Sequence, residues 1–223
     1  MDSSENYRAV RERVAAAAQR AGREVTLVAV SKTQPAAAVR RLAALGQRAF
    51  GENYVQEGLA KQRELADPGL EWHLIGPLQS NKAREVAAHF DWLQSLDRIK
   101  LVDPLDRARP AGVAPLNVLI QVNVDDEASK SGCAPAQIGA LAAAVRAAPR
   151  LALRGLMAIP APAPDLERRK AAFARMRALF EELRRDHAGV DTLSMGMSAD
   201  FELAIGAGAT MVRVGSALFG SRI

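Results

Sequence analysis

The chain has 223 residues, a net charge of +5 and an apolar fraction of 49%, which suffices for one large domain with a sizeable core. The basic excess does not predict nucleic-acid binding, because arginines alternate with acidic residues and aromatic side chains make up only 4%. The single cysteine, Cys133, excludes an internal disulfide. Without a signal-peptide pattern or a membrane-spanning apolar run, the sequence predicts a cytoplasmic protein that contacts no membrane.

Apolar runs alternate with segments of helical period along the chain. A helix over about 4–21 precedes a strand over 25–31, whose near-continuous apolar character is typical of a strand buried on both faces. Further strands are predicted at 48–51, 71–76, 91–96, 117–124, 154–159, 191–196 and 211–216. Helices are predicted between them at 35–45, 54–66, 80–89, 98–108, 135–148, 165–187 and 198–207.

This strict alternation predicts an α/β fold with a parallel sheet. Eight such units in this length favour a single (β/α)8 TIM-type barrel with an extra N-terminal helix. An open doubly wound sheet is the main competitor, but no G-x-G-x-x-G follows the first strand. We expect one domain over residues 1–223. Functional residues should then follow the C-terminal ends of the strands.

Lys32 directly follows the first predicted strand, at this functional rim. Desolvation there favours the neutral amine, which can attack a carbonyl carbon. Lysines are scarce in this chain, with six against 24 arginines, so a lysine at the rim suggests a need for its nucleophilic amine. The residues alone leave a Schiff-base lysine and an ordinary loop lysine equally open.

A phosphate-binding region is predicted after strands seven and eight, where (β/α)8 barrels often bind phosphate. Ser198 stands at the expected N-cap of the helix over 198–207, and Gly215 and Ser216 follow the last strand. Glycine allows close backbone approach, and the hydroxyls can donate to phosphate oxygens. Ordinary helix capping by both serines is the alternative.

Arg213 lies in the middle of the last predicted strand, so it points either to a salt-bridge partner or to a ligand. If it points to a ligand, a pyridine nitrogen is a natural acceptor, because arginine donates hydrogen bonds permanently. The nitrogen would then stay unprotonated, which weakens the ring as an electron sink. Such a site would hold the ring well and promote carbanion chemistry poorly.

Several long motifs, in order, resemble the YggS/PROSC family of pyridoxal phosphate homeostasis proteins from about residue 5 to the end. They are VAVSKTQP, FGENYVQEG, WHLIGPLQSNK, NVLIQVNVDDEASKSG, RGLMAIP and LSMGMSADFELAIGAGATMVRVGSALFG. The resemblance implies a barrel like the N-terminal barrel of alanine racemase, bearing pyridoxal 5'-phosphate (PLP). It implies that Lys32 is the Schiff-base lysine and that Arg213 faces the pyridine. It further implies that Ser198, Gly215 and Ser216 bind the phosphate, with Ser194 as a further phosphate neighbour and Asn53 at the rim after strand two. The family often has threonine where this chain has Ser216.

The resemblance implies a protein that holds PLP and supplies it to apo-enzymes, thereby affecting amino-acid and keto-acid balance. The main alternative is a PLP-dependent racemase, which needs a second acid/base group besides the PLP lysine. In alanine racemase-like enzymes this group is a tyrosine from a separate domain, which we do not expect here. Tyr7 and Tyr54 fall in or beside predicted helices, and His73 lies within a strand as a packed or hydrogen-bonded residue.

The sequence also bears on an aldolase alternative, on the role of Lys130, on the oligomeric state and on metal binding. A cofactor-free Schiff-base aldolase would also use a barrel lysine, but it would be colourless. Lys130, in the loop after strand five, could offer a second amine for receiving or releasing PLP, although a solvated loop lysine explains it as well. We expect a monomer and no metal site, because no cluster of His, Cys and Asp has ligand spacing.

Overall fold

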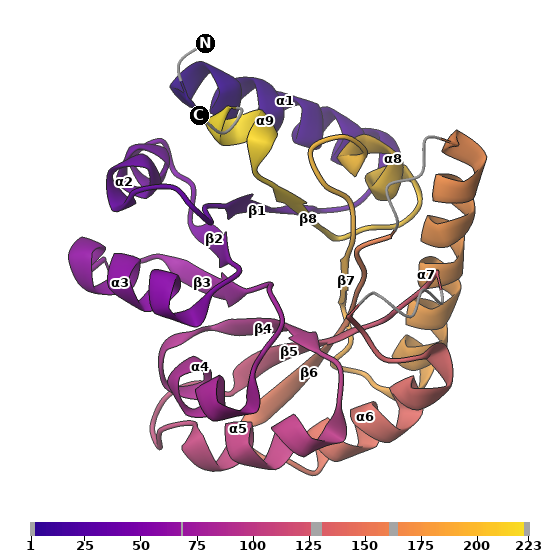
Figure 1. The fold of residues 1–223 in the computed structure, drawn as a ribbon. Helices are drawn as coiled ribbons and strands as arrows, with labels where there is room; N and C mark the ends of the chain where they lie inside the picture. Colours follow the sequence, from indigo (N-terminus) through magenta and orange to yellow (C-terminus); the bar gives the residue numbers. More distant parts are fainter. Residues whose placement is uncertain (1–2, 68, 126–130, 161–164, 221–223) are drawn as a thin grey trace.

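In the computed structural model, eight parallel strands close into a barrel in the order of the sequence, which confirms the predicted (β/α)8 fold (Figure 1). The structure describes residues 3–67, 69–125, 131–160 and 165–220. The strands are β1 Thr26–Val30, β2 Ala49–Glu52, β3 Glu71–Leu74, β4 Trp92–Leu96, β5 Leu116–Gln121, β6 Leu151–Met157, β7 Thr192–Ser194 and β8 Met211–Val214. The pairing of β1 with β8 closes the barrel.

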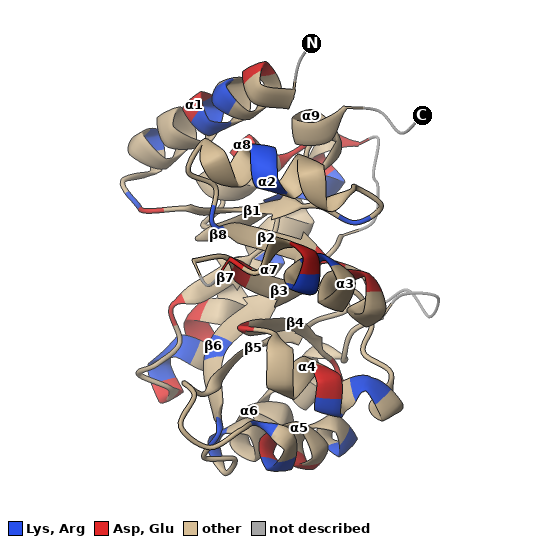
Figure 2. Ribbon diagram, turned by 90° about the vertical axis from the view of Figure 1, so that its left-hand side faces the viewer, with Lys and Arg blue, Asp and Glu red and all other residues tan. Residues whose placement is uncertain are grey.

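Helices surround the barrel on its outside, and charged residues lie mainly on them (Figure 2). The helices are α1 Ser3–Ala21, α2 Ala36–Ala44, α3 Val55–Leu65, α4 Ala83–His89, α5 Val102–Ala108, α6 Ile138–Arg146, α7 Leu166–Asp186, α8 Phe201–Gly206 and α9 Ser216–Phe219, with short 3-10 turns η1 Ser80–Lys82, η2 Ile99–Leu101 and η3 Pro135–Gln137. No helix among the described residues is long and apolar enough to cross a membrane.

The extra N-terminal helix α1 packs on α8 and α9, on the β8 side of the barrel (Figure 1). Its buried residues are Tyr7, Val10, Val14 and Ala17, whose spacing of three and four places them on one face of the helix. This face covers the part of the chain that follows β7 and β8. The extra helix therefore supports the region where the sequence predicts phosphate binding.

Most element boundaries differ by a few residues from the sequence predictions, and two of these differences have a clear physical cause. β6 spans Leu151–Met157 rather than 154–159, because its pairing with β5 already begins at Leu151. The helix predicted from residue 198 begins only at Phe201, with Asp200 as its N-cap. The chain turns first at Gly196, which has φ +93°, a conformation that favours glycine. The prediction of Ser198 as the N-cap is therefore wrong, and its hydroxyl is left for another role.

Candidate functional site

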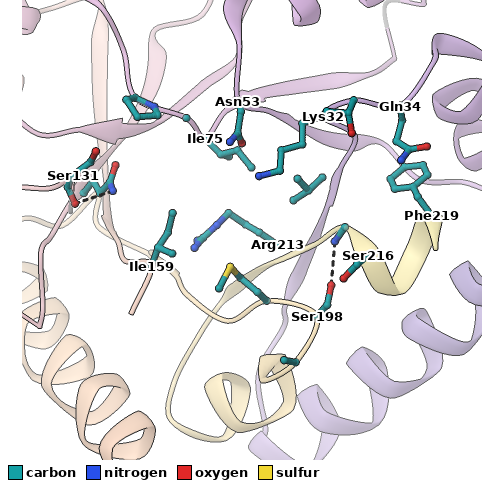
Figure 3. Close-up of a pocket in the computed structure, with 18 of the residues that line it drawn as sticks. Lys32, Gln34, Asn53, Ile75, Ser131, Ile159, Ser198, Arg213, Ser216 and Phe219 are labelled. Carbon is teal, nitrogen blue, oxygen red and sulfur yellow. Dashed lines mark hydrogen bonds between the residues drawn. The ribbon is translucent and has the colours of Figure 1, made fainter. Parts of the chain in front are cut away.

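A cavity of about 670 Å³ opens at the C-terminal ends of the strands (Figure 3). This is the end at which (β/α)8 barrels carry their active sites. Its polar lining comes from the loops after β1, β2, β5, β7 and β8 and from two strand residues, Gln121 and Arg213. The lining residues used below are Lys32, Asn53, Ser198, Arg213, Gly215 and Ser216.

Lys32 and Arg213 are the only ionisable side chains among the described residues that line this cavity. They approach it from different strands, and the nitrogen-bearing ends of both side chains lie within it (Figure 3). The described lining therefore holds two basic side chains and no carboxylate. Such a cavity favours an anionic ligand.

The backbone on both sides of Lys32 is held from the helix layer behind the pocket. The carbonyl oxygen of Ser31 accepts a hydrogen bond of 2.6 Å from Lys61 Nζ on α3. The N–H of Thr33 donates to the Glu57 carboxylate. Thr33 adopts φ 64°, a left-handed conformation that is unfavourable for a threonine. The loop carrying Lys32 is therefore fixed in a conformation that it would not adopt unaided.

Lys61 joins these contacts into one buried cluster. Its ammonium group also donates to Glu52 Oε1 at 2.7 Å and to Glu57 Oε1 at 2.8 Å. Glu52 is fully buried and accepts a further hydrogen bond of 2.6 Å from Ser31 Oγ. Burial raises the pKa of Glu52, and the hydrogen bonds from Lys61 and Ser31 offset only part of that rise. A buried ammonium between two carboxylates thus anchors the loop that presents Lys32.

Lys61 was not among the residues singled out from the sequence. One signal was available, since the buried positions of α3 are Val55, Gly58 and Lys61, which places a lysine in an apolar stripe. Glu57, four residues earlier, is the helical neighbour that pairs with it. A charged residue in such a stripe indicates a buried partner, but the sequence does not show which one.

The turns after β7 and β8 meet at Ser198. The N–H groups of Gly215 and Ala217 both donate to Ser198 Oγ, at 3.3 Å each. Figure 3 shows the Ser198 bond at the edge of the pocket, beside Ser216. These long hydrogen bonds place two backbone donors and two hydroxyl groups around one corner of the cavity. Because Ser198 Oγ accepts from these N–H groups, its own hydrogen can be donated to a ligand, as can that of Ser216. We call this corner, formed by Ser198, Gly215 and Ser216, the phosphate corner, because hydroxyl groups are common phosphate donors.

Arg213 is buried to 3% exposure and is held by neutral acceptors. Its Nη1 donates to Ser194 Oγ at 2.5 Å, and its Nη2 donates to the Ala158 carbonyl oxygen at 2.8 Å. Burial lowers the pKa of Arg213 to about 10, with Asp200 acting in the opposite direction. The guanidinium group therefore keeps its charge at neutral pH and can donate to a ligand in the cavity.

The structure brings six of the seven residues implicated by the sequence into the pocket lining. Ser194 is the exception, because it lies inside the barrel with its hydroxyl bonded to Arg213 and Gln94 rather than facing the phosphate corner. Lys130 lies outside the described residues. Tyr54 precedes α3 and is 66% exposed, whereas Tyr7 is buried in the core, and neither lines the pocket. No group of metal-ligating residues occurs in the described part of the chain.

Comparison with known proteins places this geometry in a family. The model of the alanine racemase N-terminal domain matches residues 6–223. The pyridoxal phosphate homeostasis protein of Pseudomonas aeruginosa is 59% identical, covering 98% of this chain and 95% of its own. The Escherichia coli protein of the same name is 54% identical, covering 99% and 97%.

Solved structures give the same result. PipY of Synechococcus elongatus, determined with PLP bound, has a TM-score of 0.87 and 40% identity, covering 98% of this chain and all of its own. The alanine racemase of Corynebacterium glutamicum has a TM-score of 0.65 at 22% identity and covers 95% of this chain and 60% of its own, which shows a shared fold alone. The chain therefore belongs to the alanine racemase N-terminal domain family, among the pyridoxal phosphate homeostasis proteins.

Proposed function

We propose that this chain binds PLP in the pocket through a Schiff base on Lys32, and that it stores and supplies the cofactor rather than turning over a substrate. The observation that carries the proposal is that Lys32 and Arg213 are the only ionisable groups in the described lining. The relatives named for PLP homeostasis and the PLP-bound PipY support it. We further propose that the chain acts as one domain and as a monomer in the cytoplasm.

The residues present fit the cofactor at three points. The phosphate corner offers the hydroxyl groups of Ser198 and Ser216 to the phosphate, and the Gly215 N–H holds the Ser198 oxygen in place. Arg213 offers a permanent donor to the pyridine nitrogen. Lys32 offers the amine for the aldehyde, with Asn53 beside it in the lining (Figure 3). When bound, PLP supplies an electron-withdrawing ring, and an arginine partner weakens that effect.

Storage and release follow from reversible chemistry at one amine. When PLP is bound, the Lys32 Nζ would form a C=N bond with the aldehyde carbon, and the carbonyl oxygen would leave as water. A second amine, such as the lysine of an apo-enzyme, restores the free Lys32 amine when it takes over the same carbon. Because the described lining holds no Tyr, His, Cys, Asp or Glu, the protons of this exchange would pass between the two amines and solvent.

Racemase activity is the competing function. It requires two proton-transfer groups on opposite sides of the substrate. The described lining holds no Tyr, His, Cys, Asp or Glu, and Arg213 keeps its proton, so Lys32 is left as a single candidate group. Incubating the PLP-loaded protein with amino acids and following exchange of the α-proton with solvent tests this point. We expect no exchange above that of free PLP, and rapid exchange would overturn the carrier proposal.

The covalent link is tested by adding PLP, reducing with borohydride and mapping the modified peptide. The expected result is a yellow protein with the label on Lys32. Lys32→Ala should abolish the label, while the exposed lysine variant Lys100→Ala should retain it. A colourless protein that takes up no PLP would overturn the proposal and favour a cofactor-free aldolase.

Supply is tested separately by mixing the loaded protein with a PLP-dependent apo-enzyme. The rate of apo-enzyme activation is compared with that obtained from free PLP at the same concentration. We expect activation to proceed from the loaded protein even when a scavenger removes free PLP. Activation that stops with the scavenger would restrict the role to storage.

A further inference from the structure

A line of hydrogen bonds runs through the barrel from Arg213 to the opposite end. Arg213 Nη1 donates to Ser194 Oγ at 2.5 Å, and Ser194 Oγ donates to Gln94 Oε1 at 2.7 Å. Gln94 Nε2 lies 2.9 Å from His73 Nδ1, and His73 Nε2 lies 2.8 Å from Glu71 Oε1. The five residues belong to β8, β7, β4 and β3, so the line crosses the barrel interior. We refer to Ser194, Gln94 and His73 as the relay.

The arginine fixes the direction of every bond in the line. A guanidinium only donates, so the Ser194 hydroxyl must use its own hydrogen toward Gln94. The Gln94 carbonyl oxygen then faces Ser194, and its NH2 group faces His73 and the Met211 sulfur, 3.2 Å away. His73 Nδ1 must accept, which leaves the ring hydrogen on Nε2, directed at the Glu71 carboxylate.

The relay is unusual for the interior of such a barrel, which is commonly filled by branched apolar side chains. Ser194, Gln94 and His73 are all fully buried. A buried polar group without a partner is costly, so each member depends on its neighbour. Apolar residues could fill the same space, as they do in the adjacent interior cluster with Val28, Trp92 and Met211. The polar line therefore calls for a function beyond packing.

The member of the line that reaches the pocket is Arg213. Ser194 Oγ and the Ala158 carbonyl oxygen hold two of its N–H groups and so fix the plane of the guanidinium. Because Ser194 Oγ donates its hydrogen to Gln94, a lone pair of the same oxygen faces Arg213. Gln94 in turn is oriented by His73. The orientation of the charged group in the pocket thus depends on side chains that never reach it.

We propose that Ser194, Gln94 and His73 are positioning residues that aim Arg213 at the ring nitrogen of the bound cofactor. This inference rests on the proposed binding of PLP. It predicts that weakening the relay costs affinity only for ligands that carry the ring nitrogen. A relay that merely stabilised the barrel would affect all ligands of the pocket equally.

The experiment compares PLP with its 1-deaza analogue, in which a C–H group replaces the ring nitrogen. Ser194→Ala and Gln94→Leu should weaken PLP binding about five- to tenfold, the effect of one hydrogen bond. Binding of the deaza analogue should stay within about twofold of the unmodified protein, and Arg213→Leu should show the same contrast. The absorption band of bound PLP should shift in the relay variants, because it reports on the ring nitrogen.

Thr192→Val is the matched control, since Thr192 is buried on the same strand but its hydroxyl bonds to Asp191 instead. It should not distinguish the two ligands. Equal losses for PLP and the deaza analogue in the relay variants would overturn the inference, whereas failure of the unmodified protein to bind PLP would overturn the proposed function itself.

A second measurement needs no variant. Nitrogen-15 NMR of the ligand-free protein should show His73 with its hydrogen on Nε2 and with Nδ1 as an acceptor. Addition of PLP should shift the His73 signals, because the line begins at the residue that contacts the ring. A hydrogen on Nδ1 would reverse the order of donors and overturn the relay.

Discussion

The β1–β2 side of the pocket holds the loop of Lys32 with buried charges, whereas on the β7–β8 side neutral acceptors hold the side chain of Arg213. On the first side, Lys61 lies between Glu52 and Glu57 and fixes the backbone around Lys32. On the second, the acceptors are hydroxyl, amide and carbonyl oxygens. We therefore expect removal of a buried charge to affect the first side most, and distortion of a backbone turn to affect the second.

The difference follows from what each side presents to the ligand. If Lys32 forms and breaks a covalent bond, as we propose, it needs a fixed backbone but no carboxylate beside its amine. Lys61 pairs with the nearby carboxylates behind the loop, so they do not pair with Lys32. Under the proposed function, the other side attracts a phosphate and a ring nitrogen, and a carboxylate hydrogen-bonded to Arg213 would weaken that attraction.

The largest effect is expected on the charged side, from Lys61→Met. This change leaves Glu52 buried at 0% exposure without its cation. Removing one partner of a buried ion pair typically costs about 3–5 kcal/mol. We expect a loss of this size in the free energy of unfolding, measured by urea denaturation, and a matching loss of PLP labelling at Lys32.

The pH dependence of this loss has a defined sign. Burial already raises the pKa of Glu52 in the folded protein, and loss of Lys61 raises it further. The unfolded state releases the Glu52 proton near the ordinary carboxyl pKa of about 4.3, whereas the folded state keeps it up to the raised pKa of Glu52. The variant therefore loses stability as pH rises from about 4.3 to that raised pKa. Lys61→Met with Glu52→Gln should recover part of the loss. A cost below about 1 kcal/mol would show that the charged cluster is not what holds this side.

The sequence predicts the barrel and the position of Lys32 because both depend on local pattern. Alternating apolar runs and helical segments give the fold, and the end of a buried strand places Lys32 at the rim. The partners of these residues depend on packing between distant segments. The spacing of Lys61 from Val55 and Gly58 indicates a buried partner, but Ser31 and Glu52 become visible as its partners only when α3 lies behind β1 and β2.

The sequence does not predict the contacts within the relay, for a related reason. Parallel strands buried on both faces do not show which residues point into the barrel. Ser194 therefore resembled a phosphate neighbour, and Gln94 gave no signal. His73 was correctly expected to be packed or hydrogen-bonded, but its partners Glu71 and Gln94 became visible only with the strands in register.

The β7–β8 side depends on the backbone turn at Gly196. We expect the next largest loss of stability from Gly196→Ala, which tests this turn. Gly196 has φ +93°, and an added Cβ would lie 2.5 Å from the Ala204 Cβ and 3.0 Å from the Phe201 Cα. Overpacking of this kind costs about 1–3 kcal/mol. We expect a loss in this range by urea denaturation, with weaker PLP binding because α8 moves away from Ser198.

Gly206→Ala is the matched control within α8, because nothing lies within 4 Å of the added Cβ and no positive φ is involved. It should leave PLP affinity unchanged. If Gly196→Ala behaves like this control, the turn after β7 does not set the geometry of the phosphate corner.

The smallest effect is expected at Thr33, where the charged side stores backbone strain. Thr33 has φ 64°, and a left-handed conformation costs an ordinary residue about 1–2 kcal/mol. Thr33→Gly removes this cost but keeps the backbone N–H that donates to Glu57. We expect the free energy of unfolding to rise by up to about 1 kcal/mol, since the greater chain entropy of glycine in the unfolded state offsets part of the gain. PLP affinity should stay unchanged.

Ala66→Gly is the control, at the other non-glycine residue with positive φ among those described. It should stabilise the protein similarly without lying near the pocket. If Thr33→Gly instead weakens PLP binding while Ala66→Gly does not, the threonine side chain, and not the Lys61 cluster alone, holds the loop that presents Lys32.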